Sequence, residues 1–332
     1  MTDTATRELA IVIPAYKDIY LRQTLQSIAC QTDRRFTLYI GSDASPYDLE
    51  SIVDEFRDRI HIVYHRFETN LGASDLVGQW ERCISLTQGE PYLWLFSDDD
   101  LMEPDCVATY LALPEEFRSS ALFHFNLKVI DSTADSDKCG CVSEAAKYPS
   151  RLDAREYIRA KLTGRIISFV VEFVFPRKLY DKVGGFQNFD MAWGADFMTW
   201  VKMAAEAPLG IISEPQSENA AVIWRKSDSN ISPDKSHDVM IRKLNAVIDN
   251  AAFLKSLFRH KYKTFFSLRP RFRWLRFPLG DIYRARDLLT REDIRLLTKA
   301  YMRKVGFIEA ALLTRLLANY RRSHSPHHAL QS

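Results

Sequence analysis

Three consecutive carboxylates, Asp98, Asp99 and Asp100, stand where a short apolar run of the sequence ends. Residues 93–96 are apolar, so we expect a buried strand that opens into an acidic turn. Adjacent acids repel one another, and burial strengthens the repulsion, so such a turn needs either water or a cation beside it. Oxygen ligands of this kind suit Mg²⁺ or Mn²⁺, which bridge carboxylate and phosphate oxygens. The alternative is a solvated acidic turn that caps a helix starting near Glu103.

Further candidate residues follow two other predicted strands, residues 9–15 and 36–40. Pro14 and Tyr16 stand at the end of the first strand, and Asp43 follows the second. Because ligands of open α/β sheets bind beyond the carboxyl ends of the strands, we expect these residues beside the acidic turn. There the Tyr16 ring can pack on a base, Asp43 can accept hydrogen bonds from a base or ribose, and a cation can neutralise phosphates. The alternative for Tyr16 is ordinary packing.

The elements that must position these residues alternate between strand and helix patterns along the first half of the chain. This alternation predicts a doubly wound α/β sheet, and the near-continuous apolar character of residues 9–15 predicts a strand buried on both faces. Farther along, we expect one strand at residues 121–130, a long polar loop at 131–149 and strands at 165–176 and 220–224.

The composition is that of an ordinary soluble protein. Of 332 residues, 46% are hydrophobic and 27% charged, and the formal net charge is +2. No apolar run reaches the roughly 20 residues of a membrane helix, and the N-terminal sequence resembles no signal peptide. We therefore expect a cytoplasmic protein. The five cysteines fit neither a disulfide framework nor a zinc site.

Four motifs, in this order, resemble those of family 2 glycosyltransferases, which have the GT-A fold, over roughly residues 8–232. They are residues 11–16, residues 42–45, residues 70–72 and the Asp98–Asp100 turn with Pro104 downstream. The resemblance implies that Asp43 contacts uracil or ribose and that Asp98 contacts the ribose. It also implies that Asp99 holds a divalent metal on the nucleotide diphosphate, and that Asp100 supports the metal or the donor sugar.

The same resemblance implies a catalytic base late in the domain. Asp196 matches its position, although Ala195 stands where the family usually has an acid. The structural alternative is that Asp196 only caps a helix over residues 196–207. Neighbouring candidates for donor or acceptor contacts are Trp193 and Gly194.

A second late segment of the resemblance contains Trp224 and Arg225, which are further candidates for donor or acceptor contacts. Ser227 stands where a histidine is common, which leaves the third metal ligand open. The Gln-x-x-Arg-Trp motif of processive synthases is absent from the sequence, which indicates the addition of one sugar per encounter.

The expected domains are a GT-A domain at residues 1–235, a helical extension at 236–322 and a disordered tail at 323–332. Within the extension, we expect a long amphipathic helix at residues 291–322. Residues 255–277 are basic and aromatic. They form either a solvated surface, a patch that lies on an anionic membrane, or, least favoured, a nucleic-acid site.

Together with these observations, the resemblance implies a metal-dependent, inverting glycosyltransferase that uses Mn²⁺ or Mg²⁺. It would move one sugar from a nucleotide sugar, a UDP-sugar, to a glycan or lipid-linked acceptor in surface polysaccharide synthesis. We expect the protein to bind peripherally to the inner face of the plasma membrane. We do not expect it to bind nucleic acid. The alternatives are a catalytically inactive GT-A module that binds a nucleotide or a partner, and a sugar nucleotidyltransferase, which would need a glycine-rich loop after the first strand.

Overall fold

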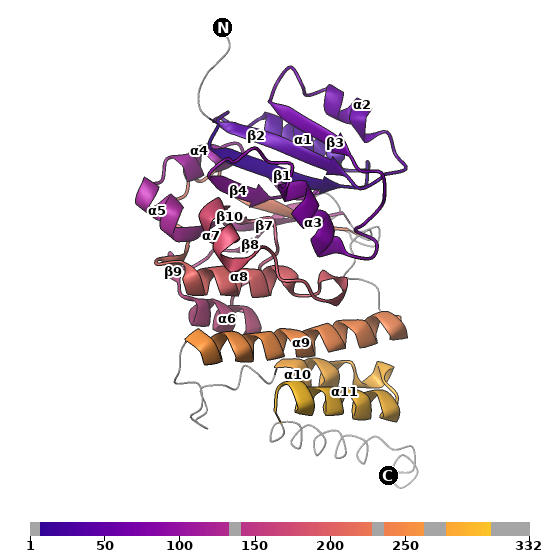
Figure 1. Cartoon of the computed structure of the whole chain (residues 1–332). Coiled ribbons are helices and arrows are strands. Elements are labelled where there is room, and N and C mark those ends of the chain that lie inside the picture. The colour runs from indigo at the N-terminus through magenta and orange to yellow at the C-terminus, as the bar shows by residue number, and fades with distance from the viewer. Residues whose placement is uncertain (1–6, 133–140, 228–235, 262–276, 307–332) are drawn as a thin grey trace. The chain divides into compact units, whose positions relative to one another are not determined.

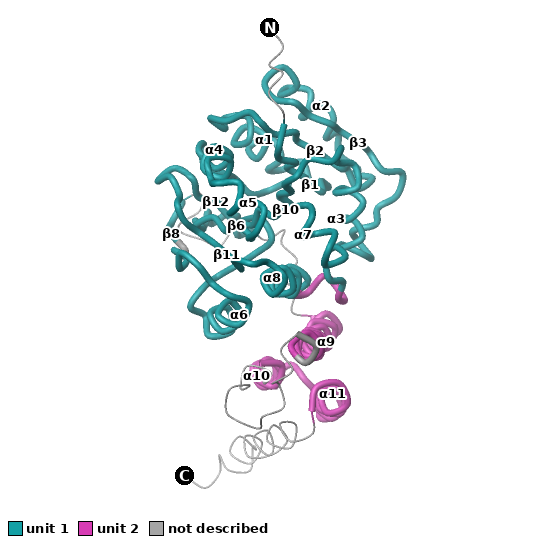
Figure 2. Tube along the Cα trace, turned by 60° about the vertical axis from the view of Figure 1, so that its left-hand side comes forward, with its two compact units in different colours: residues 1–188, 195–231 teal, residues 189–194, 232–332 magenta. Residues whose placement is uncertain are grey.

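The computed structural model describes residues 7–132, 141–227, 236–261 and 277–306 (Figure 1). The chain divides into two compact units (Figure 2). The first contains residues 1–188 and 195–231, and the second contains residues 189–194 and 232–332. Among the described residues, no helix is both long and apolar enough to span a membrane.

The first unit is built on two sheets with helices packed against them. Its elements are, in order, β1 (Leu9–Ala15), α1 (Leu21–Ala29), β2 (Phe36–Ser42), α2 (Leu49–Asp54), β3 (Ile62–Arg66), α3 (Leu76–Ile84), β4 (Tyr92–Leu95), β5 (Leu101–Met102), α4 (Cys106–Leu111), α5 (Glu115–Ser120), β6 (Ala121–His124), β7 (Leu127–Asp131), β8 (Val142–Ala146), β9 (Arg151–Leu152), α6 (Ala154–Leu162), β10 (Phe173–Pro176), α7 (Arg177–Val183), α8 (Ala195–Glu206), β11 (Gly210–Ile212) and β12 (Val222–Lys226).

The larger sheet has the strand order β3-β2-β1-β4-β10-β6-β11-β9. β3, β2, β1 and β4 are parallel neighbours, whereas β10 runs antiparallel to both β4 and β6. Leu9, Ile11 and Ile13 of β1 belong to the core that contains α1 and α2, while Ala10 and Val12 are buried on the opposite face. Both faces of this strand are therefore covered, as its apolar run predicts. The expected α/β fold with a largely parallel sheet is confirmed.

The smaller sheet has the order β5-β12-β7-β8. The two sheets together correct three expectations from the sequence. The single strand expected at residues 121–130 is two strands, β6 and β7, which belong to different sheets. The loop expected at residues 131–149 contains β8, which pairs antiparallel with β7. Most of the strand expected at residues 165–176 is irregular, since only Phe173–Pro176 pairs as β10.

The second unit is helical and has a core of its own. It contains η1 (Asp190–Ala192), α9 (His237–Lys261), α10 (Phe277–Arg284), η3 (Arg286–Leu288) and α11 (Arg291–Lys304). Leu244, Ile248 and Ala251 of α9 line one helical face and pack with Ile282 and Tyr301. The helix expected at residues 291–322 ends at Lys304 in its described part. Most of the basic segment 255–277 and the whole tail 323–332 lie outside the described residues.

Candidate active site

The loop after β1 is held by Asp98. One oxygen of its carboxylate, Oδ2, accepts hydrogen bonds from the backbone N–H groups of Tyr16 (2.8 Å) and Lys17 (2.9 Å). These hydrogen bonds therefore join the acidic turn after β4 to the loop after β1. The two segments lie close together because β1 and β4 are neighbouring parallel strands. The Tyr16 side chain is 38% exposed, so its ring is accessible at this edge of the sheet.

The Asp98 carboxyl lies in an environment that resists its ionisation. Burial and the neighbouring Asp99 charge raise the pKa of Asp98 to about 6, although the two amide hydrogen bonds favour the charged form. A cation beside this turn would lower that pKa again, because an opposite charge favours the carboxylate.

Asp43 follows β2 and is almost completely buried, with 4% of its surface exposed. Its two oxygens accept hydrogen bonds from the N–H groups of Leu71 (2.7 Å) and Gly72 (2.8 Å), and it also pairs with the Arg82 guanidinium. A Cβ at Gly72 would lie 2.7 Å from Asp43 Oδ2, so only glycine leaves room for this contact. The motif at residues 70–72 is thus a loop that folds around Asp43.

Asp100 is tied to β12, far away in the sequence. Its Oδ1 accepts the backbone N–H of Arg225 at 2.6 Å, and its Oδ2 accepts the hydroxyl of Ser97 at 2.7 Å. Only 3% of Asp100 is exposed, and burial, followed by the Asp99 charge, raises its pKa well above the usual value. This carboxyl therefore braces the acidic turn from the inside.

Arg225 secures the same turn with its side chain. Its Nε donates to the carbonyl of Asp99 at 2.7 Å, and its Nη2 donates to Gln23 Oε1 at 2.8 Å. The guanidinium also lies over the Tyr20 ring, 4.0 Å from its centroid. Trp224, its neighbour on β12, stacks on Phe169 with 4.1 Å between the ring centroids.

Asp99 fits a divalent cation best among the three acids. It is partly exposed, whereas the carboxyl of Asp98 holds the β1 loop and that of Asp100 holds β12. Burial raises the pKa of Asp99, while a hydrogen bond with the Ser97 side chain and then the Lys17 and Arg225 charges act in the opposite direction. Across the described part of the chain, no three His, Cys, Asp or Glu residues gather as a ready-made metal site. A cation bound here would need phosphate oxygens and water molecules to complete its coordination shell, which are ligands that Mg²⁺ commonly uses.

Asp196 lies in the first turn of α8, one residue after the helix begins at Ala195. It is partly buried, and burial raises the pKa of its carboxyl. Lys161 of α6 opposes this rise and Glu172 adds to it. A raised pKa makes the ionised form a stronger base, and this favours a role in proton transfer.

Trp193 and Gly194 precede α8 but belong to the second unit, where α9 holds them. Asn250 Nδ2 donates to the carbonyl of Trp193 at 3.0 Å, and Lys243 Nζ lies 4.7 Å from the centre of the Trp193 indole. Gly194 has a φ of +80°, and a Cβ there would lie 2.2 Å from Asn250 Nδ2. The missing side chain at Gly194 therefore makes room for Asn250.

The structure thus brings one group of predicted residues together. Asp98 is hydrogen-bonded to Tyr16, and Asp100 is hydrogen-bonded to Arg225. Near the end of β1, Pro14 lies opposite Gly41 of β2, and Gly41 is two residues before Asp43. The sequence analysis missed Arg82, Gln23, Ser97, Lys161 and Glu172. Only Ser97 had a local signal, since it adjoins the acidic turn.

Comparison with known proteins agrees with the fold of the first unit. Residues 10–153 match the model of the family described as glycosyl transferase family 2. The match spans less than half of the chain, so over this part the chain is similar to family 2 glycosyltransferases. Solved structures show in addition that it has the GT-A fold. A comparison with curated proteins finds no match.

Structures of S. aureus TarS share this fold at low sequence identity, and a mannosyltransferase is similar to the chain with a lower TM-score. Residues 1–349 of S. aureus TarS in complex with UDP are 15% identical, with a TM-score of 0.54 and coverage of 96% of this chain and 92% of that chain. The same protein in complex with UDP-GlcNAc is 14% identical, with a TM-score of 0.54 and coverage of 95% and 92%. The mannosyltransferase PcManGT from Pyrobaculum calidifontis, in complex with GDP-Man and Mn²⁺, is 14% identical, with a TM-score of 0.48 and coverage of 97% and 89%.

Proposed function

We propose that this protein is a metal-dependent, inverting glycosyltransferase that moves one sugar from a UDP-sugar to a hydroxyl of a glycan or lipid-linked acceptor. The observation that carries the proposal is the convergence of Tyr16, Asp43 and Asp98–Asp100 at the carboxyl ends of β1, β2 and β4. UDP is favoured because the TarS complexes, whose fold this chain shares, contain UDP and UDP-GlcNAc.

The donor would lie on this edge of the sheet. The exposed ring of Tyr16 would pack on the base, and Asp98 would contact the ribose as well as the β1 loop. Asp43 is buried and bonded to the loop at residues 70–72, so it would act at the base through its remaining lone pairs and that loop. Asp99 would hold Mn²⁺ or Mg²⁺, which when bound offsets the charge that grows on the leaving diphosphate.

Transfer would be a single displacement at the anomeric carbon. The acceptor oxygen forms the new bond to that carbon, and the bond from the carbon to the diphosphate oxygen breaks. The nucleoside diphosphate leaves with the electron pair, and Asp196 takes the proton of the acceptor hydroxyl. Trp193, Gly194, Trp224 and Arg225 remain candidates for contacts to the donor or acceptor. Arg225 would act through the turn that it braces.

We assign the acceptor to surface polysaccharide synthesis on a lipid carrier, with the protein bound peripherally to the membrane. The support is the basic and aromatic composition of residues 255–277. Co-sedimentation with anionic and neutral vesicles at two salt concentrations tests the membrane part, because electrostatic attachment weakens with salt.

A panel of UDP-, GDP- and TDP-sugars tested by thermal shift, with Mn²⁺ and with EDTA, checks the donor. A ligand at 100 times its Kd stabilises the folded state by about 2.7 kcal/mol, which is readily measured. We expect a UDP-sugar to raise the melting temperature only with the cation present. A panel without any shift would contradict the proposal, and binding without donor hydrolysis or transfer would indicate an inactive nucleotide-binding module.

A further inference from the structure

A pocket rich in arginine lies at the opposite edge of the larger sheet, where β1, β2 and β3 begin. Its volume is about 280 Å³, and the buried side chains of Phe36 and Ile60 form its apolar lining. The remaining lining residues are charged or titratable: Arg7, Arg34, Arg57, Asp58, Arg59 and His61. Arg7 precedes β1, Arg34 precedes β2, and residues 57–61 connect α2 to β3.

The pocket has more positive charge than its own acids can neutralise. Four arginines line it with a single aspartate, and Arg57 is paired at 2.5 Å with Asp54 outside the lining. The other hydrogen-bonded guanidiniums have neutral partners. Arg34 donates to the carbonyl of Arg59 at 3.2 Å, and Arg59 donates to Gln26 Oε1 at 2.8 Å. Within the described ranges, Arg7, Arg34 and Arg59 form no ion pair with an acid.

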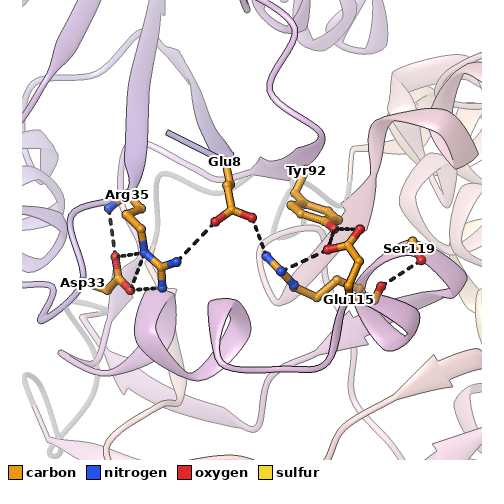
Figure 3. A network of polar contacts seen from close by, with 7 residues as sticks. Glu8, Asp33, Arg35, Tyr92, Glu115 and Ser119 are labelled. Atoms are coloured by element: carbon orange, nitrogen blue, oxygen red, sulfur yellow. Dashed lines mark hydrogen bonds and ion pairs between the residues drawn. The ribbon is translucent and has the colours of Figure 1, made fainter. Parts of the chain in front are cut away.

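Two other arginines near this edge of the sheet form ion pairs with carboxylates. Arg35, next to Arg34, pairs with Asp33 at 2.7 Å and with Glu8 at 3.2 Å (Figure 3). Arg118 pairs with Glu8 at 2.7 Å and with Glu115 at 3.0 Å. Arg35 and Arg118 are thus neutralised by carboxylates of the protein. Because Arg7, Arg34 and Arg59 have no such ion pairs among the described residues, we infer that a bound anion supplies the negative charge.

We propose that this pocket binds a phosphate group. Guanidinium groups offer paired N–H donors that match phosphate oxygens, and several of them around one hollow make a phosphate preferable to chloride. The apolar lining of Phe36 and Ile60 leaves room for a small organic part of the same ligand.

This site is separate from the proposed donor site. β2 runs from Phe36, which lines the pocket, to Ser42, which precedes Asp43. Seven residues of strand, at about 3.3 Å per residue, place the two ends roughly 20 Å apart. One nucleotide diphosphate held at the carboxyl edge cannot also fill the arginine pocket. The phosphate belongs either to a dissolved metabolite or to the head group of an anionic lipid.

Calorimetric titration with inorganic pyrophosphate, in EDTA and at constant ionic strength, tests the first source. We expect saturable binding that the double substitution Arg34→Gln with Arg59→Gln weakens at least tenfold. Arg303→Gln, which removes an exposed charge on α11, is the matched control and should leave the binding unchanged. If circular dichroism shows that the double variant misfolds, Arg7→Gln alone replaces it.

Co-sedimentation with phosphatidic acid vesicles, against phosphatidylcholine vesicles, tests the second source with the same variants. Binding in either arm that depends on Arg34 and Arg59 supports the pocket and identifies the source. Absence of binding in both arms, or equal loss in the Arg303→Gln control, would overturn it.

His61 gives a local signal for the same titration. Burial and the Arg7 charge hold the pKa of His61 below its usual value, so a phosphate bound beside it should raise that pKa. The imidazole resonances of His61, assigned by their loss in His61→Gln, should shift with pyrophosphate. Asp99→Ala should leave this response intact, which separates it from donor binding.

Discussion

The carboxylate of Asp100 accepts the backbone N–H of Arg225 across 2.6 Å, although 125 residues separate the two in the sequence. This bond ties the acidic turn after β4 to β12, and the Arg225 guanidinium reinforces it at the carbonyl of Asp99. Asp98 ties the same turn to the loop after β1. The turn is thereby fixed from two sides, and Asp99 lies between the two anchoring residues.

Replacing Asp99 with alanine should abolish transfer and the Mn²⁺-dependent part of UDP binding. Asp99 is partly exposed, as is Asp98, but Asp98 holds the β1 loop, whereas Asp99 is the carboxylate that we assign to the cation. Calorimetric titration with UDP, with and without Mn²⁺, provides the measurement. Glu50→Ala, an exposed acid on α2, is the control. Unchanged Mn²⁺-dependent affinity in Asp99→Ala would remove Asp99 from the metal site.

Asp196→Asn should lower the transfer rate by about 10²–10⁴-fold with little change in donor affinity, because it keeps the shape and removes the base. Burial raises the pKa of Asp196, so the wild-type rate should rise with pH as this carboxyl ionises above its usual range. The remaining activity of Asp196→Asn should lack that rise. Asp181→Asn, an exposed acid on α7, serves as the control. A variant that kept its rate and lost only thermal stability would make Asp196 a structural residue of α8.

Asp98→Asn should make the protein more stable at pH 7 than the wild type. The folded-state pKa of Asp98 is about 6, above the usual value of about 4, so between these limits the folded protein binds more protons than the unfolded chain. The stability that protonated Asp98 contributes is therefore present below about pH 4 and lost as pH rises through about 6. Asparagine can still accept both amide hydrogen bonds, because both go to one oxygen.

Melting temperatures of wild type and Asp98→Asn from pH 4.5 to 7 provide the test. We expect their difference to grow with pH and to level off above about 6. If the difference in melting temperature between the two proteins did not change with pH, ionisation of Asp98 would not destabilise the folded protein.

Gly72→Ala should lower both the melting temperature and the affinity for the donor. The new Cβ would approach Asp43 Oδ2 to 2.7 Å, so the loop at residues 70–72 or the Asp43 carboxylate must move. Gly280→Ala in α10 is the matched control, since its Cβ would meet nothing nearer than Arg284 Nη1 at 3.5 Å. In a helix interior this control should gain about 1 kcal/mol of stability. If both variants behaved alike, the close packing of Gly72 on Asp43 would be refuted.

The sequence was most informative where the structure is local. The apolar runs of β1, β2 and β4 and the polar residues that follow them were recognisable, because each strand carries its own pattern and parallel strands share one edge. The pairing of β7 with β8 was not recognisable, since residues 131–149 have no regular period and β8 is defined by its partner. The antiparallel insertion of β10 between β4 and β6 also depends on distant strands.

The candidate site divides in the same way. Asp43, Asp98 and Asp99 were predicted from residue type and position, and so were Tyr16 and residues 70–72 that bond to them, whereas Arg82 was not. Arg82 lies 39 residues from Asp43, and no spacing rule connects the two. The raised pKa of Asp196 could not be anticipated from its place in the first turn of a helix, where the dipole alone would lower it. Burial overrides the dipole there.

The short segment from Phe189 to Gly194 has a practical consequence for anyone cutting this protein into pieces. It belongs to the helical unit, although the chain on both sides of it belongs to the other unit. Asp190 pairs with Arg242 at 2.6 Å, and the Trp193 carbonyl is bonded to Asn250, so both anchors lie on α9. Truncation after residue 231 would deprive this segment of both partners just ahead of the helix that carries Asp196. The C-terminal helices are therefore a poor choice for deletion or for exchange between relatives, even though they fold around a core of their own.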